Sequence, residues 1–158
     1  MFSLLPEDDE ELRQLQEQLR RGSRDSFQLL KNFPENPICS ITVDEAARTL
    51  MIVWKQYATQ VQLRFIHETL LRMIRAHGVC KILGDDTALP TVPLEDQEWI
   101  AQNWMPRAMG SGLRFIANKP PESYFGKLSI RSIQALAPPD LQFRSFEELR
   151  SADGPAVG

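Results

Sequence analysis

The spacing of apolar residues changes along the chain, and this change predicts the order of the secondary structure. Segments 38–44 ("ICSITVD") and 49–55 ("TLMIVWK") are rich in β-branched and aromatic residues and flank the polar stretch "EAAR", which predicts an antiparallel hairpin. The following segment 58–78 ("ATQVQLRFIHETLLRMIRAHG") has apolar residues at helical spacing and ends at a glycine. The pattern therefore predicts a hairpin and then a long helix.

Strands and helices alternate through the rest of the chain. We predict strands over 79–83, 112–118 and 141–145, and helices over 93–106, 121–137 and 145–152. We expect Pro106 to kink or end the first of these helices. A helix between two strands implies a crossover to a parallel neighbour. The expected fold is a single-domain α/β sandwich, in which a mixed sheet opens with the hairpin, continues in β-α units and carries packed helices.

The chain begins with a further predicted helix, over residues 7–21 ("EDDEELRQLQEQLRR"). Acidic residues lie in its first turn, arginines lie in its last, and three leucines follow helical spacing. Because a short isolated helix is marginal in water, we expect it to pack on the domain or on a second copy, giving a homodimer. The predicted organisation is an N-terminal helix and docked linker over 1–37, an α/β domain over 38–152 and a disordered tail over 153–158.

Composition narrows the classes of partner. The chain has 158 residues, 42% of them hydrophobic, which is enough for one domain core. Its net charge of −3 leaves no excess positive charge for phosphates, so we expect neither nucleic acid nor an anionic membrane as a partner. No apolar run approaches the roughly 18 residues of a membrane helix, and the first residues are acidic where a signal peptide is basic. We therefore expect no membrane insertion and a cytoplasmic location.

Cysteine and histidine residues do not form a metal or nucleophile pattern. Cys39 and Cys80 both fall in predicted strands, and we interpret them as small buried hydrophobic residues. His67 and His77 are ten residues apart on one helix, too far for an i, i+4 ligand pair. We expect His77 to bind the helix C-terminus and His67 to face solvent or the rim. The sequence thus predicts no catalytic residue, metal or cofactor.

Asp85 and Asp86 follow a predicted strand, at the end where open α/β sheets bind ligands. Neighbouring carboxylates can hold Mg²⁺ or accept a phosphoryl group, as in receiver domains. Aspartate is also a common turn residue that bonds its own backbone after a strand. A receiver needs a second acidic cluster after an early strand and a late lysine; Lys119 is available, but no acidic pair ends the early strands. Both interpretations of the acid pair stay open.

Trp99 and Trp104 are five residues apart on one predicted helix. At α-helical spacing they face different directions, so we expect one in the core and the other near its edge. Further aromatic and apolar residues accompany them, namely Trp54, Tyr57, Met105 and Phe125. This set forms either the wall of an apolar pocket or an ordinary core, because aromatic residues dominate core burial.

The chain resembles a known family in the order of "MIVWKQY", a long helix, "KILGDD", "PLEDQEWIAQNWMPRAMGSGLRFIA" and "FRSFEELRSA". Over about residues 38–152 it is similar to bacterial proteins of Bacteroidetes type with the SpoIIAA-like variant of the STAS fold, the domain of anti-sigma-factor antagonists. The resemblance implies a mixed sheet with helices mainly on one side. It also implies a kinase-phosphorylated serine in a strand-to-helix turn. The corresponding turn here, "DDTALPTVPLEDQ", has no Asp-Ser-Ser-Gly sequence and offers only Thr87 and Thr91 as hydroxyls.

Other SpoIIAA-like proteins are associated with small apolar or lipidic ligands, and this resemblance shapes the functional expectation. We expect a non-enzymatic regulatory or binding module that binds a protein partner or a small apolar ligand. The expected contact surface is the turn from Asp85 to Asp96 with the helix after it. The candidate binding residues are Asp85, Asp86, Thr87, Thr91, Trp99 and Trp104. The alternative is a phospho-acceptor or a metal-dependent enzyme that uses Asp85 or Asp86.

Overall fold

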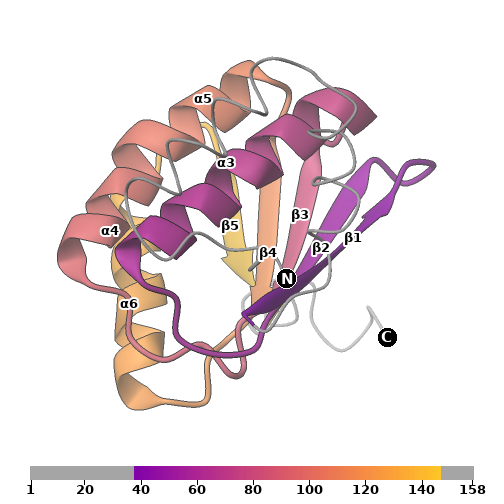
Figure 1. Ribbon diagram of the computed structural model, residues 1–158. Coiled ribbons are helices and arrows are strands. Elements are labelled where there is room, and N and C mark those ends of the chain that lie inside the picture. Colours follow the sequence, from indigo (N-terminus) through magenta and orange to yellow (C-terminus); the bar gives the residue numbers. More distant parts are fainter. Residues whose placement is uncertain (1–37, 147–158) are drawn as a thin grey trace, which may run out of the picture.

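The computed structural model describes residues 38–146 of the chain (Figure 1). These residues form a five-stranded mixed sheet with helices packed on it, which confirms the predicted fold class. The helix predicted over 7–21, the linker that follows it, most of the helix predicted over 145–152 and the tail lie outside the described residues. In chain order the elements are β1 (Cys39–Asp44), β2 (Thr49–Trp54), α3 (Gln60–His77), β3 (Lys81–Asp85), α4 (Leu94–Trp99), the π-helical segment η1 (Ile100–Trp104), α5 (Met105–Gly110), β4 (Phe115–Lys119), α6 (Tyr124–Leu136) and β5 (Gln142–Ser145).

The five strands lie side by side in their sequence order, from β1 to β5. The β1–β2 pair is antiparallel, and β3, β4 and β5 are each parallel to the strand before them. Because every crossover steps to the next strand in the same direction, the helices lie on one face of the sheet (Figure 1). Along β2, Leu50, Ile52 and Trp54 are buried toward this helical layer, whereas Met51 and Val53 on the opposite face are 40% and 42% exposed.

The ends of α3 follow from local sequence. Thr59 begins the helix with a capping box: its hydroxyl accepts from the Gln62 backbone N–H, and the Gln62 side chain accepts from the Thr59 N–H. Gly78 ends the helix with φ +63°, a left-handed conformation that glycine adopts without strain. His77, in the last turn, pairs with Glu45 of the β1–β2 loop. This contact holds the C-terminus of α3 against the hairpin.

The helix predicted over 93–106 differs from expectation at Pro106. The chain stays helical from Leu94 to Gly110, with the π-helical segment η1 between α4 and α5. The Met105 N–H donates to the Ile100 carbonyl, five residues back, which widens this turn. Pro106 follows this widened turn directly, as the second residue of α5, and does not end the helix.

The two cysteines lie in different surroundings. Cys39 is fully buried in β1, as expected, while Cys80 is partly buried and lies just before β3 and not within a strand. Among the helices of residues 38–146, none combines the length and the apolar character needed to cross a membrane.

Candidate functional site

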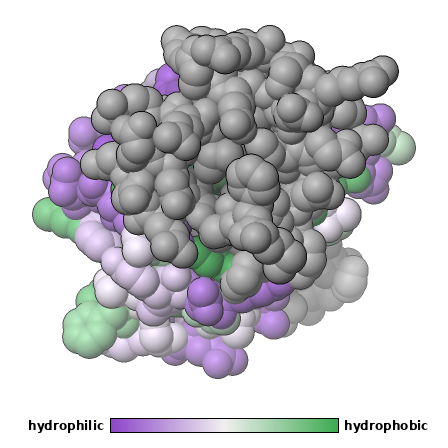
Figure 2. Space-filling view, in the orientation of Figure 1, coloured by the Kyte–Doolittle hydropathy of each residue, from purple (hydrophilic) through white to green (hydrophobic). Residues whose placement is uncertain are grey.

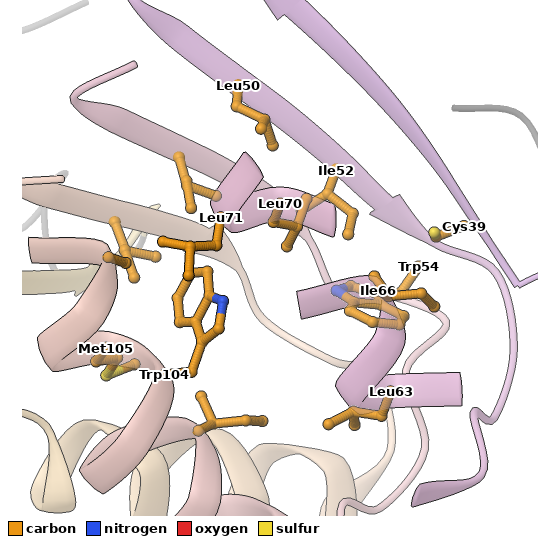
Figure 3. Packing of buried hydrophobic residues seen from close by; sticks show 14 of the residues in the cluster. Cys39, Leu50, Ile52, Trp54, Leu63, Ile66, Leu70, Leu71, Trp104 and Met105 are labelled. Carbon is orange, nitrogen blue, oxygen red and sulfur yellow. The ribbon is translucent and has the colours of Figure 1, made fainter. Parts of the chain in front are cut away.

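A cavity of about 90 Å³ lies between the sheet and the helical layer. Its wall is mostly apolar and combines inward-facing residues of β2 to β5 with residues of α3, η1, α5 and α6. Figure 3 shows Trp54 of β2 and Trp104 of η1 pointing into the interior between these two layers. Leu63 and Leu70 of α3 line the same space. The cavity is large enough for several non-hydrogen atoms.

Two polar residues meet at the carboxyl ends of β3 and β4, where the wall of the cavity is no longer apolar. Asp86 and Asn118 are 6% and 2% exposed, and Nδ2 of Asn118 donates to Oδ2 of Asp86 at 2.9 Å. Gly84 of β3 faces this pair, and a methyl group at its Cα would lie in ordinary contact with Asp86 Oδ1, at 3.4 Å. Ligands of open α/β sheets bind at this edge.

The charge of Asp86 is buried and only partly offset by its surroundings. Desolvation raises the pKa of Asp86 to about 6, the hydrogen bond from Asn118 opposes the shift, and the nearby charge of Asp85 adds to it. Within the described part of the chain, no lysine, arginine or histidine forms an ion pair with Asp86. The second amide atom of Asn118, Oδ1, is buried and has no hydrogen-bond partner in the structure. Both groups are therefore available to a ligand.

His67 of α3 also lines the cavity, and all three tryptophans of the chain surround it. Its ring stacks on Trp54 at 6.0 Å and meets Trp99 and Trp104 edge-on at 6.0 and 5.0 Å. Nδ1 lies 2.8 Å from the Leu63 carbonyl, which can only accept, so Nδ1 carries the proton and Nε2 is an acceptor. Desolvation lowers the pKa of His67 to about 4, so the ring is neutral at pH 7.

The expectation that His67 faces solvent or the rim is wrong, because the aromatic rings and one backbone carbonyl together provide a dry, hydrogen-bonded place for a neutral imidazole. A signal was present in the sequence. His67 lies four residues after Leu63 and three before Leu70, on the apolar stripe of the helix. Asn118 was missed as well, although it is an amide within the apolar run "FIAN".

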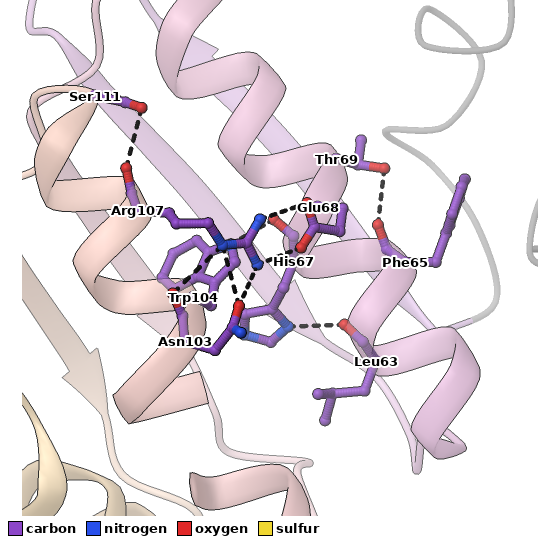
Figure 4. A network of polar contacts seen from close by, with 9 residues as sticks. All are labelled: Leu63, Phe65, His67, Glu68, Thr69, Asn103, Trp104, Arg107 and Ser111. Carbon is purple, nitrogen blue, oxygen red and sulfur yellow. Dashed lines mark hydrogen bonds and ion pairs between the residues drawn. The ribbon is translucent and has the colours of Figure 1, made fainter. Parts of the chain in front are cut away.

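The π-helical segment brings Trp99 and Trp104 to the same imidazole. Five α-helical residues separate two side chains by roughly 140° around the helix axis, whereas a π-helical turn places them near one another. The expected burial is confirmed, since Trp104 is 2% exposed and Trp99 is half-buried. The expected divergence of the two rings is wrong. Trp104 Nε1 also donates to the His67 backbone carbonyl at 2.6 Å (Figure 4).

Two arginines cover the outer side of Trp99. The guanidinium carbons of Arg64 and Arg107 lie 5.1 and 5.9 Å from the centre of its ring. Figure 4 shows Arg107 of α5 between Glu68 and Asn103, with Nη1 donating to Glu68 Oε2 at 2.9 Å. These contacts join α3 to η1 and α5, so they hold the tryptophans in place against His67.

Asp85 and Asp86 do not form one site. Asp85 is the last residue of β3, is in register with Lys119 and faces the side of the sheet opposite to Gly84 and Asp86. Hydrogen bonding from Thr87, whose backbone N–H donates to Asp85 Oδ1 at 3.0 Å, lowers the pKa of Asp85. Within residues 38–146, no group of three or more His, Cys, Asp or Glu residues is placed to hold a metal ion. The turn interpretation fits Asp85, and Asp86 belongs to the cavity.

The turn after β3 is anchored to α6. Ser129 Oγ accepts from the Val92 backbone N–H at 2.9 Å and lies 3.3 Å from the Thr91 hydroxyl. Gly126 permits this packing, since a methyl group there would lie 2.7 Å from the Leu89 carbonyl oxygen. Leu89 and Val92 consequently reach the cavity wall.

The remaining candidate residues lie outside this cavity. Thr87 is half-buried and Thr91 is exposed, and neither lines the wall. Tyr57 and Phe125, expected as possible pocket residues, are 50% and 67% exposed and are also absent from it. Of the aromatic and apolar residues considered for a pocket, Trp54, Trp104 and Met105 line the wall. Trp99 does not line it, but its ring contacts His67, which does.

Comparison with known proteins adds no family assignment. No protein-family model matches the chain, and no curated protein shows significant similarity to it.

Proposed function

We propose that this chain is a non-enzymatic, SpoIIAA-like binding module that takes a small, mostly apolar ligand into the cavity between sheet and helices. The observation that carries the proposal is the composition of the cavity wall. It is apolar over most of its area, and buried Asp86 and Asn118 converge on it at one end. Small-molecule sites have this composition, and in α/β proteins they lie at the carboxyl ends of the strands.

The arrangement of the elements supports the SpoIIAA-like part of the proposal. The mixed sheet and the helical layer on one of its faces agree with what the sequence resemblance implies. The turn that would carry a regulatory serine in that family offers an exposed Thr91 and a half-buried Thr87 in its place. Agreement in fold supports the family resemblance, whereas the activity has to be inferred from the residues of the site.

The alternative, a phospho-acceptor or a metal-dependent enzyme, has less support. It requires Asp85 and Asp86 to act together, and their carboxyl groups lie on opposite sides of the sheet. Asp86 lies at the end of a mostly apolar cavity, where a hydrated Mg²⁺ ion would lose water that it releases reluctantly.

Xenon tests the cavity without involving polar recognition. Methyl-labelled protein is titrated with dissolved xenon, and we expect the largest NMR shifts at Leu63, Leu70 and Ile130, which line the cavity. Leu70→Phe fills the space and should abolish these shifts. Leu128→Phe is the matched control, because Leu128 is 41% exposed on α6. Shifts spread over surface methyl groups, or shifts unchanged in Leu70→Phe, would contradict the proposal.

A protein partner is a second candidate, favoured by an exposed aromatic pair at the start of α6. Tyr124 and Phe125 are 69% and 67% exposed, and their rings meet edge-on at 5.4 Å. Leu94, at the start of the neighbouring α4, is 61% exposed. The lower left of Figure 2, where α6 lies in Figure 1, shows hydrophobic atoms at the surface. A protein retained by wild type and lost with Tyr124→Ser/Phe125→Ser would support this role, and equal retention would contradict it.

A further inference from the structure

The three polar side chains of the cavity present hydrogen-bond acceptors. The ionised Asp86 carboxylate can only accept, so the Asn118 NH₂ group must face it and Oδ1 is the amide atom left over. His67 donates from Nδ1 to the Leu63 carbonyl, which leaves Nε2 as an acceptor without a partner among the described residues. A ligand that satisfies these groups must bring donors.

The buried negative charge of Asp86 favours a ligand whose hydrogen-bond donor is positively charged. Asp86 is 6% exposed and has no ion pair in the described part of the chain. Two other titratable groups near the cavity do not compensate it: Asp85 is also acidic, and His67 is neutral at pH 7. A buried charge is costly unless it is paired, so a positive ligand gains more here than a neutral one of the same shape.

We propose that the cavity takes a small protonated primary amine, whose ammonium group donates to the Asp86 carboxylate and Asn118 Oδ1 while its hydrocarbon body fills the apolar part. This inference rests on the proposed function. An ammonium group carries three donors and no acceptor, which matches the acceptors on the wall. The rings of Trp54 and Trp104 on the same wall are compatible with a cation. A carboxylate ligand would add acceptors and a like charge, so it is excluded by the same groups.

Three compounds with the same four-carbon body test the proposal. Butylamine, 1-butanol and butanoate are titrated at pH 7.5 by calorimetry, with tryptophan fluorescence as a second readout. We expect butylamine to bind about tenfold more tightly than 1-butanol, because hydrogen bonds to charged groups are stronger than neutral ones. Butanoate should not bind. A butanol affinity equal to or above that of butylamine would overturn the amine proposal.

Substitutions test whether Asp86 causes the preference for butylamine over 1-butanol. Asp86→Asn should weaken butylamine about tenfold and change 1-butanol less than about threefold, since it removes the negative charge and replaces one carboxylate oxygen by an amide NH₂ group. Asp85→Asn makes the same chemical change on the opposite side of the sheet and should leave both affinities unchanged. Asn118→Ala removes the Oδ1 acceptor and should weaken butylamine independently. Unchanged butylamine binding in both Asp86→Asn and Asn118→Ala would reject the inference.

The xenon titration distinguishes a failure of the amine proposal from a failure of the proposed small-ligand function. Xenon binding without an amine preference leaves the cavity as an apolar ligand site and rejects only the amine. If neither xenon nor any of the three compounds binds, both the amine and the proposed small-ligand function are wrong.

Discussion

Asn118 Nδ2 donates a hydrogen bond of 2.9 Å to Asp86 Oδ2 and so joins β4 to the residue that follows β3. This bond ties the orientation of a buried amide to the charge of a buried carboxyl group. With Asp86 ionised, the amide must present its NH₂ group to the acid; once Asp86 is protonated, the amide oxygen can accept from the acid. Because burial raises the pKa of Asp86 to about 6, the polar end of the cavity changes character near that pH.

The pKa of Asp86 predicts a pH-dependent loss of stability. A carboxyl group with a pKa raised from 3.8 to about 6 holds its proton more tightly in the folded protein than in the unfolded chain. Its contribution is therefore present at low pH and is lost as pH rises from about 4 to about 6. The free energy of unfolding of wild type should fall by an amount on the order of 3 kcal/mol over this range, and that of Asp86→Asn should not show this fall. Urea unfolding from pH 4 to 8 measures it, with Asp85→Asn as the control. A stability difference between Asp86→Asn and wild type that does not change with pH would contradict the prediction.

His67 predicts the opposite pH dependence. Burial lowers its pKa from 6.5 to about 4, so the unfolded chain takes up a proton that the folded protein does not. Stability is lost as pH falls from about 6.5 to about 4, by an amount on the order of 3 kcal/mol. His67→Gln removes this dependence. In wild type the two groups partly cancel between pH 4 and 6, so Asp86→Asn should be more acid-sensitive than wild type, and His67→Gln less so. Parallel stability curves for all three proteins would disprove this assignment.

Replacing each of the two tryptophans beside His67 by phenylalanine should lower the stability of the fold by different amounts. Trp104→Phe removes the N–H that donates to the buried His67 carbonyl and shortens a side chain that is 2% exposed. We expect a loss of about 2–4 kcal/mol in the free energy of unfolding. Trp99→Phe is the matched control: its ring is half-buried and its N–H donates to none of residues 38–146, so it should cost less than about 1.5 kcal/mol. Thermal and urea unfolding of both variants check the order, and equal losses would count against it.

Ser129 predicts how firmly the turn after β3 is held. Its hydroxyl accepts from the Val92 N–H at 2.9 Å and is 3% exposed. Ser129→Ala leaves that buried N–H without a partner, which should cost about 1–3 kcal/mol. Hydrogen exchange of the Val92 amide should accelerate in the variant. Ser132→Ala, three residues further along the same helix and only partly buried, provides the comparison. Slow exchange at Val92 in Ser129→Ala would show that the turn is held by other contacts.

The regular elements were predictable because local signals agree with tertiary structure there. The hairpin at residues 38–55 and the helix at residues 58–78 appear within a few residues of their predicted bounds, since strand composition and helix caps are written locally. The helix around Pro106 was not predictable in detail. An α-helical period was assumed across Trp99 to Trp104, and the π-helical turn that replaces it is accompanied by contacts to α3, far away in the sequence.

The candidate site was predicted only in part. Asp86 and Trp104 were named and do line the cavity, but Asp86 was treated as one of a pair with Asp85. Strand alternation separates these two residues, and the inward-facing Gly84 already indicates which side Asp86 can occupy. His67 and Asn118 were not named as site residues, because a polar residue at an apolar position shows its role only when its buried partners are known.

The π-helical turn also lets this segment hold one extra residue without moving the cavity wall. That residue lies between Trp99 and Trp104, and both rings still reach His67 although they are five residues apart. In a chain one residue shorter, an α-helix would place the same two side chains four residues apart, about 40° from each other around the axis, so Trp104 and Met105 would keep their side of the helix. A second deletion would instead rotate everything after it by about 100° and take both residues off the wall. The number of residues in this segment therefore determines the cavity as much as their identity does.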